Sequence, residues 1–95
     1  MIYRKKISRL EAENGYIMIE RNEVDRFPPL GAKFALRFGE LSFRARVTAN
    51  PSNYDGAWHD DYHIEARDLK HVVAVAEGRD IVIAANEGAF ELRFG

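Results

Sequence analysis

Alternating hydrophobic and polar residues in the segment KFALRFGELSFRARV predict two neighbouring β-strands. Apolar residues recur at every second position over Phe34–Phe38 and again over Leu41–Val47, which is the period of a half-buried strand. The Gly39-Glu40 pair between them suits a two-residue type II′ turn. This turn sets a register in which all the apolar side chains share one face. The segment therefore predicts a tight β-hairpin.

The same register places four cations together on the outward face of this hairpin. They are Lys33, Arg37, Arg44 and Arg46. Like charges on facing strands are mildly destabilising. We therefore expect either acidic side chains on a neighbouring strand or an anionic partner to offset them.

The N-terminal third predicts a second hairpin followed by an irregular excursion. KISRLEAENGYIMIE has the pattern of a strand, an Asn14-Gly15 turn and a strand over Gly15–Glu20. The two prolines of RNEVDRFPPLG exclude a central strand, so we expect an excursion there with one helical turn over Asn22–Arg26. Phe27 and Leu30 are expected to anchor it to the core.

The C-terminal half predicts further strands. A loop over Asn50–His63 leads into a strand in DYHIEA. Residues 69–76 have both helical spacing and a β-branched run, so helix and strand stay open. The tail predicts a strand over Ile81–Ala84, a turn at Gly88, and a last strand with Phe90, Leu92 and Phe94 on one face.

Together these segments predict an all-β fold, a small single-domain β-barrel or pseudobarrel over residues 1–95. Seven to eight short strands joined by tight turns are typical of such folds. Closing the sheet removes exposed strand edges, and one or two short helices are expected to cover the ends.

The composition excludes several other classes. Hydrophobic residues make up 46% and charged residues 31% of the 95 residues, as in ordinary globular domains. No apolar run approaches the roughly 20 residues of a membrane helix, and no signal peptide is recognisable at the start. Cysteine is absent, which excludes disulfides and thiolate metal sites. We expect a cytoplasmic protein without a membrane partner.

The net charge of −1 conceals two oppositely charged halves. Residues 1–49 hold ten Lys and Arg against six Asp and Glu, whereas residues 50–95 hold four against nine. Such a chain can carry a basic face despite its nearly neutral total. Pairing of the two halves across the fold is the alternative.

The Asn50–His63 segment concentrates chemistry that a simple connection does not need. It holds the only Trp, two of the four Tyr and two of the three His. A metal site built from His59, Asp61 and His63, completed by His71, is conceivable, but strong zinc signals use spaced pairs from separate elements. We therefore predict no metal. No phosphate loop, nucleophile elbow or catalytic His constellation appears, so we also predict a non-enzymatic module without a cofactor.

Two partial motifs resemble those of the bacterial PilZ domains, β-barrels that bind cyclic di-GMP. Those domains use Arg-x-x-x-Arg before the barrel and Asp/Asn-x-Ser-x-x-Gly on a strand. Here Lys5 and Arg9 have the first spacing with a Lys substituted, and NPSNYDG runs one residue too long before Gly56. A cyclic-dinucleotide sensor is therefore only a further alternative.

Nucleic-acid binding accounts for more of the residues. It needs cations for phosphates, and amide, guanidinium, imidazole or aromatic groups for base edges. The candidate residues are Arg21, Asn22, Arg26, Lys33, Arg37, Arg44, Arg46, Asn50, Asn53, Tyr54, Trp58, His59 and Tyr62. Asp55, Asp60 and Asp61 oppose it because they repel phosphate. For Trp58 and Tyr62 the alternative is that they cap the core.

The order of these segments resembles the DNA-binding pseudobarrel of plant-specific transcription factors and of some restriction-enzyme recognition domains. GYIMIE…RFPPLG is similar to the first strand and Phe-Pro excursion of that family, and EGRDIVIAANEGAFELRF to its closing Gly-Asp-x-Val hairpin, with Arg79 inserted. The resemblance spans residues 14–94. It implies two arms that grip the major groove, at Arg21–Arg26 and Asn50–Tyr62. The net charge departs from the basic character usual of lone DNA binders.

The leading expectation is therefore a module that recognises double-stranded DNA. The chief alternative is a protein-interaction module, of an accessory, phage or toxin–antitoxin type. There Trp58 would dominate the contact, because Trp and Tyr are enriched at interface hot spots. The sequence does not indicate an oligomeric state.

Overall fold

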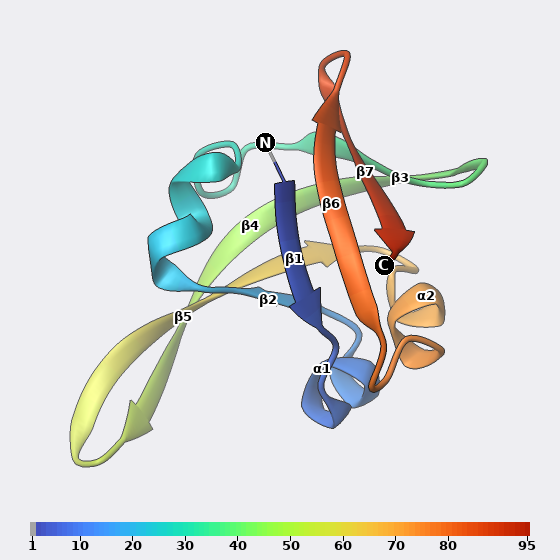
Figure 1. The fold of residues 1–95 in the computed structure, drawn as a ribbon. Coiled ribbons are helices and arrows are strands. Elements are labelled where there is room, and N and C mark those ends of the chain that lie inside the picture. Colours follow the sequence, from blue (N-terminus) through green and yellow to red (C-terminus); the bar gives the residue numbers. More distant parts are fainter. Residues whose placement is uncertain (1) are drawn as a thin grey trace.

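The computed structural model describes residues 2–95, without the side chains of Ile2 and Tyr54, as one curled sheet with three short helices (Figure 1). The strands are β1 (Ile2–Lys6), β2 (Ile17–Ile19), β3 (Phe34–Phe38), β4 (Leu41–Tyr54), β5 (Ala57–Ala66), β6 (Asp80–Asn86) and β7 (Ala89–Phe94). The helices are α1 (Arg9–Asn14), the 3₁₀ helix η1 (Arg21–Arg26) and α2 (Lys70–Ala74). The strand order is β1-β6-β7-β3-β4-β5-β2. The predicted small, barrel-like all-β fold is confirmed.

The β3–β4 hairpin has the predicted register. Phe34 pairs with Ala45 and Leu36 with Phe43, and all four are buried. Gly39 has a positive φ of 59° in the turn, as the first central residue of a type II′ turn requires. The cationic side chains of this hairpin are exposed on the opposite face. Turn chemistry and hydrophobic alternation therefore agree on one arrangement.

Side chains, rather than a strand ladder, join the two edge strands of the curled sheet. The Tyr3 hydroxyl on β1 donates to the Met18 carbonyl on β2 at 3.2 Å and accepts from the Glu20 N–H at 3.2 Å. The buried Glu11 carboxylate accepts from Lys5 Nζ at 2.6 Å and from the Met18 N–H at 2.7 Å. The seam between β1 and β2 is thus held by one phenol and one carboxylate.

The predicted N-terminal hairpin is wrong, because its first half is the helix α1. Ser8 and Glu11 form a capping box: Ser8 Oγ accepts from the Glu11 N–H, and the Glu11 carboxylate accepts from the Ser8 N–H. Gly15 ends the helix with φ 79°, the left-handed conformation typical of a C-terminal cap. Asn14-Gly15 therefore terminates a helix and does not join two paired strands.

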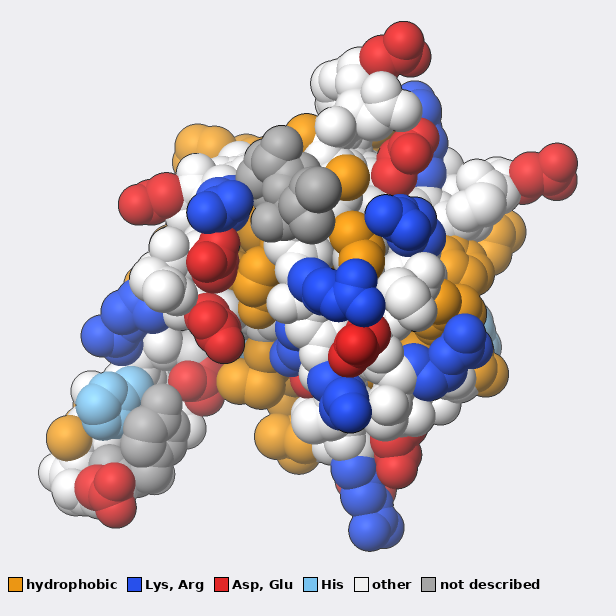
Figure 2. All heavy atoms as spheres, in the orientation of Figure 1, with side chains coloured by type: hydrophobic (Ala, Val, Ile, Leu, Met, Phe, Trp, Pro, Cys, Tyr) orange, Lys and Arg blue, Asp and Glu red, His pale blue; other side chains and the backbone are white. Residues whose placement is uncertain are grey.

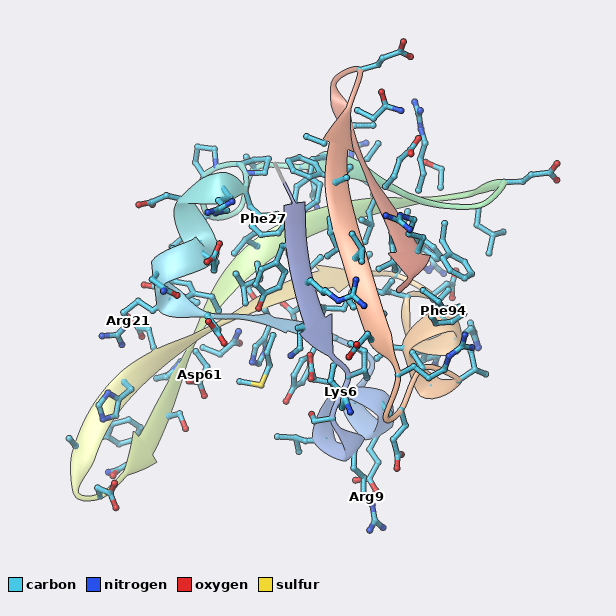
Figure 3. All side chains as sticks on the ribbon, in the orientation of Figure 1. Lys6, Arg9, Arg21, Phe27, Asp61 and Phe94 are labelled. Carbon is cyan, nitrogen blue, oxygen red and sulfur yellow. The ribbon has the colours of Figure 1, made fainter. Side chains whose placement is uncertain are left out.

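The helices cover the two ends of the sheet, as expected, but the structure has three of them instead of one or two. α1 and α2 lie side by side at one end (Figure 1). The segment left open at residues 69–76 contains α2, with Leu69, Val72 and Val73 buried. At the other end η1 confirms the predicted helical turn and directs Phe27 into the core (Figure 3). Leu30 was wrongly expected to anchor this excursion, since it is 54% exposed.

The predicted loop over residues 50–63 is wrong as well. β4 and β5 continue through it as a two-stranded ribbon joined by Asp55 and Gly56. Both turn residues have positive φ, 55° and 75°, as a type I′ hairpin turn requires. The ribbon projects from the sheet (Figure 1), and the molecule measures 43 × 27 × 22 Å along its principal axes. The closing hairpin of β6 and β7, with its turn at Gly88, is confirmed.

Candidate nucleic-acid interface

One continuous polar face runs along β4 from the hairpin turn into the ribbon. Because Phe43, Ala45 and Val47 are buried, the even-numbered side chains alternate to the outer face. The residues of this face are Ser42, Arg44 and Arg46, which are exposed, and Thr48, Asn50 and Ser52, which are half-buried. From the first to the last they span about 33 Å at roughly 3.3 Å per residue. The cations lie over the sheet, and the uncharged hydrogen-bonding groups lie on the ribbon.

A basic groove adjoins the cationic end of this face. It has a volume of about 890 Å³. Five of its lining residues are cations: Lys33, Arg44, Arg46, Arg67 and Lys70. Two acids, Glu65 and Asp68, also line it. Side chains from several elements thus bring positive charge together in one groove. No single stretch of the sequence contains all of these cations.

The cations of the basic groove are not neutralised by ion pairs. The four ion pairs among the described residues join Arg4 to Asp80, Lys5 to Glu11, Arg9 to Glu13 and Arg26 to Glu23. None of these involves a cation of the groove. Glu65 lies opposite Arg46 in the ladder, but its Oε2 accepts from Thr48 Oγ1 at 2.6 Å. The groove therefore carries a net positive charge, five cations against two acids.

A hydrogen-bond network fixes the polar face where the ribbon leaves the sheet. Asn50 Nδ2 donates to Thr48 Oγ1 at 2.9 Å and lies 3.1 Å from His63 Nδ1. The His63 ring stacks on Tyr16 with centroids 3.8 Å apart. Burial lowers the pKa of His63, with Glu65 and Asp61 opposing the shift. A neutral His63 can accept the Asn50 hydrogen bond, so the network is self-consistent.

The strand register separates the three acids of the ribbon. Asp60 lies opposite Pro51, on the same face as Trp58 and Tyr62, away from the polar face. Asp55 is in the turn. Asp61 lies opposite Asn50 and shares the polar face. One of the three acids therefore accompanies the predicted phosphate-binding side chains along this face.

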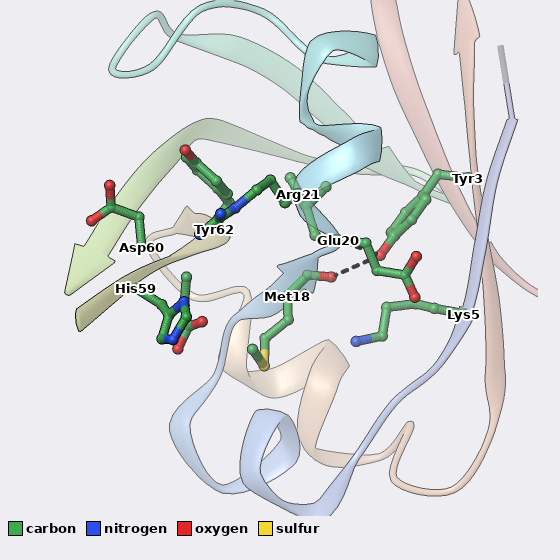
Figure 4. Close-up of a pocket in the computed structure, with 10 residues that line it drawn as sticks. Tyr3, Lys5, Met18, Glu20, Arg21, His59, Asp60 and Tyr62 are labelled. Carbon is green, nitrogen blue, oxygen red and sulfur yellow. Dashed lines mark hydrogen bonds between the residues drawn. The ribbon is translucent and has the colours of Figure 1, made fainter. Parts of the chain in front are cut away.

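A second hollow of about 380 Å³ lies between the ribbon and the barrel. Arg21, at the start of η1, reaches across it toward Tyr62 on β5 (Figure 4). His59 and Asp60 line the ribbon side, and Glu20 lies on the barrel side. Acidic side chains follow this hollow on the molecular surface (Figure 2). This acidic hollow shares no lining residue with the basic groove.

The predicted site residues consequently divide into two groups instead of forming one surface. Lys33, Arg44 and Arg46 line the basic groove, and Arg37 shares the same outer face. Arg21, His59 and Tyr62 line the acidic hollow. Asn22 and Arg26 are exposed on η1, and Asn53 and Trp58 lie opposite each other near the end of the ribbon. The Tyr54 side chain lies outside the described part of the chain.

Trp58 and Tyr62 have different surroundings. Trp58 is 72% exposed, which excludes its expected alternative role as a cap on the core. Tyr62 is half-buried and packs against the core. Of the two aromatic rings, Trp58 is therefore the one available to a partner.

Three residues of the basic groove were missed by the sequence interpretation. Arg67 precedes α2, Lys70 is its first residue, and Tyr16 precedes β2. Nothing in their local sequence marks them, since a cation near a helix start and a Tyr before a strand are ordinary. Only the pairing of β2 with β5 carries Tyr16 to His63.

Three findings bear on a metal site, a cyclic-dinucleotide site and a membrane span. Within the described residues, no group of three or more His, Asp or Glu side chains is arranged to hold a metal ion. Lys5 and Arg9, the cations of the PilZ-like spacing, pair with Glu11 and Glu13. None of the helices in the described chain combines the length and hydrophobicity that a membrane crossing requires.

Comparison of the chain with family models, curated proteins and solved structures finds no match. The resemblance to the DNA-binding pseudobarrel stays a prediction.

Proposed function

We propose that this domain is a binding module for double-stranded DNA, with the basic groove on phosphates and the ribbon in the major groove. The observation that carries this proposal is the continuity of the groove with the polar face of β4. Arg44 and Arg46 follow Ser42 and precede Thr48, Asn50 and Ser52 on one side of a single strand. Phosphate contacts position a protein on DNA, and hydrogen-bonding groups in the groove read the bases.

The dimensions support this proposal. The major groove of B-form DNA admits a two-stranded β-ribbon. The polar face is about 33 Å long at roughly 3.3 Å per residue, close to the roughly 34–36 Å of one turn of the double helix. A ligand of that length can contact the groove cations and the ribbon together.

Salt dependence tests the proposal. Five phosphate contacts predict a slope of about −4.5 in log affinity against log salt. Affinity for a fluorescein-labelled 20-bp duplex, followed by anisotropy, should then fall a few hundred-fold between about 50 and 200 mM salt. Arg44→Glu combined with Arg46→Glu should reduce the slope and abolish binding at the higher salt concentration.

The matched control is Lys6→Glu combined with Arg9→Glu. It changes the total charge by the same amount, and both residues are exposed outside the basic groove. Arg9 points away from the body of the domain (Figure 3). The control should retain most of the affinity. Equal affinity of the groove variant and the wild-type protein, or an equal loss in the control, would defeat the proposal.

Exposure of Trp58 favours a second candidate function, a protein-interaction module. A 72% exposed Trp at the end of a projecting ribbon is the type of residue that dominates interface hot spots. Binding centred on Trp58 should be nearly independent of salt and lost in Trp58→Ala. Duplex binding should depend on salt and on Arg44 and Arg46.

A further inference from the structure

The ribbon has one strand edge that the described chain leaves open. β5 pairs with β4 over its whole length, Ala57–Ala66. On its other side, β2 covers only Tyr62–Ile64. No described strand pairs with that side over residues 57–61. An open edge of this kind is a template for another extended chain.

The turn determines which backbone groups face this edge. In a two-residue hairpin the residues flanking the turn exchange hydrogen bonds, and the pairs then alternate. The pairs Asn53–Trp58 and Pro51–Asp60 are therefore of the non-hydrogen-bonded kind. The N–H and C=O groups of Trp58 and Asp60 point away from β4, toward the open edge.

The other edge of the ribbon, the outer side of β4, is blocked by a proline. Pro51 has no N–H, and its nitrogen faces the outer side of β4. Natural proteins use proline in this way to prevent pairing at a sheet edge. Residues 57–61 of β5 contain no proline. The two edges therefore differ in their capacity to accept a strand.

The side chains beside the open edge favour a basic occupant. Trp58 and Asp60 share one face of β5, next to the hollow that Glu20 also lines. Lys5 and Arg21 line this hollow too, but Lys5 is paired with the buried Glu11, and the three acids of the hollow, Glu20, Asp60 and Asp61, outnumber Arg21. A cation placed beside Trp58 and Asp60 could interact with both the indole ring and the carboxylate.

We propose that the edge of β5 at residues 57–61 binds an extended peptide segment of a partner protein by strand addition, with Lys or Arg at alternate positions of that segment. Alternate residues of an added strand face the same side, so these cations would lie next to Trp58 and Asp60. A second copy of the chain fits less well. Edge-to-edge pairing of two copies would place the Asp60 and Asp61 carboxylates of both copies in one short ladder that contains no Lys or Arg, and neighbouring like charges are destabilising there.

Strand addition and simple charge attraction are separated by two variants at one position. Asp60→Ala removes the carboxylate and keeps the N–H. Asp60→Pro removes both, and the fold should tolerate it because the Asp60 N–H makes no bond to β4. The probe is a fluorescein-labelled nine-residue peptide in which arginine and threonine alternate. Two control peptides are used. One has glutamate in place of arginine, and the other is the arginine peptide N-methylated at alternate residues.

Wild-type protein should bind the arginine peptide at about 50 mM salt and fail to bind the glutamate peptide. Asp60→Ala and Trp58→Ala should each weaken binding about fivefold, the effect of one exposed ionic or cation–π contact. Asp60→Pro should weaken it at least tenfold more than Asp60→Ala, with unchanged circular dichroism. Arg44→Glu with Arg46→Glu should bind the peptide at least as tightly as the wild-type protein does, because its added negative charge attracts a basic peptide at low salt; this separates the site from the DNA-binding surface.

Equal binding by the two Asp60 variants would refute strand addition. Should Asp60→Pro fail to fold, equal binding of the N-methylated and unmodified peptides to wild-type protein would refute it as well. Absence of peptide binding to the wild-type protein would also overturn the proposal. A dimer in sedimentation that Asp60→Pro dissociates would replace the peptide by a second copy.

Discussion

Replacement of Glu11 should remove the main polar link between the two edge strands. This carboxylate is 1% exposed and accepts four hydrogen bonds, from Lys5 Nζ, the Met18 N–H, and the N–H and hydroxyl of Ser8. In Glu11→Ala the ammonium group of Lys5 loses its partner, and two backbone N–H groups lose theirs. The carboxylate contacts that join β1, α1 and β2 are then lost in one step, and the Tyr3 hydroxyl bonds to β2 remain.

The expected cost of Glu11→Ala follows from these contacts. Removing one member of a buried ion pair costs about 3–5 kcal/mol. The Lys5 side chain is 19% exposed and can regain some water, so we expect a value near the lower limit, about 3 kcal/mol. That is a large part of the roughly 5–15 kcal/mol by which domains are stable. Glu11→Gln keeps the shape and one acceptor, so its cost should be smaller, about 1–3 kcal/mol.

Urea unfolding followed by far-ultraviolet circular dichroism measures these losses. Fluorescence is a poor probe, since Trp58 is exposed on the ribbon. With an m value of about 1–1.5 kcal/mol per molar urea, Glu11→Ala should lower the midpoint by about 2–3 M. The control Glu13→Ala removes an exposed pair with Arg9 and should cost under about 0.5 kcal/mol. Equal midpoints for Glu11→Ala and Glu13→Ala would show that the carboxylate does not hold the seam.

Two further predictions concern the ribbon. Trp58→Ala should leave the free energy of unfolding within about 0.5 kcal/mol of wild type in the same urea experiment, as for other exposed positions; a loss of several kcal/mol would mean that the ring packs on the core. His63 should make stability depend on pH, because burial lowers its pKa in the folded protein below the ordinary histidine value of 6.5. As pH falls below about 6.5, the unfolded chain takes up this proton before the folded protein does. The contribution of His63 to the free energy of unfolding is therefore complete above that pH. It is lost as pH falls through the lower pKa of the folded protein. The unfolding free energy of wild type should therefore decline more steeply over this acidic range than that of His63→Phe, and parallel pH curves for the two proteins would contradict this role.

The sequence determined the elements whose signals are local. Alternation over residues 34–47 and the Gly39 turn were sufficient for the β3–β4 hairpin, its register and its outward cations. Local signals were also present where the interpretation failed. Ser8 and Glu11 have the spacing of a capping box, and Asp55-Gly56 is a strong hairpin turn. The helix α1 and the ribbon were thus predictable from the sequence, although we assigned them as strand and loop.

Only the tertiary structure decided which residues share a surface. The pairing of β2 with β5 and the position of α2 bring Tyr16, Arg67 and Lys70 to the cations of β4. The register of β4 against β5 moves Asp60 to the face opposite the polar face and leaves the Asp60 backbone at an open edge. Such placements depend on contacts between residues far apart in the chain, and the period of a strand contains no information about its partner. The sequence therefore determined the faces of single strands, whereas packing of the whole sheet determined the surfaces on which both proposals depend.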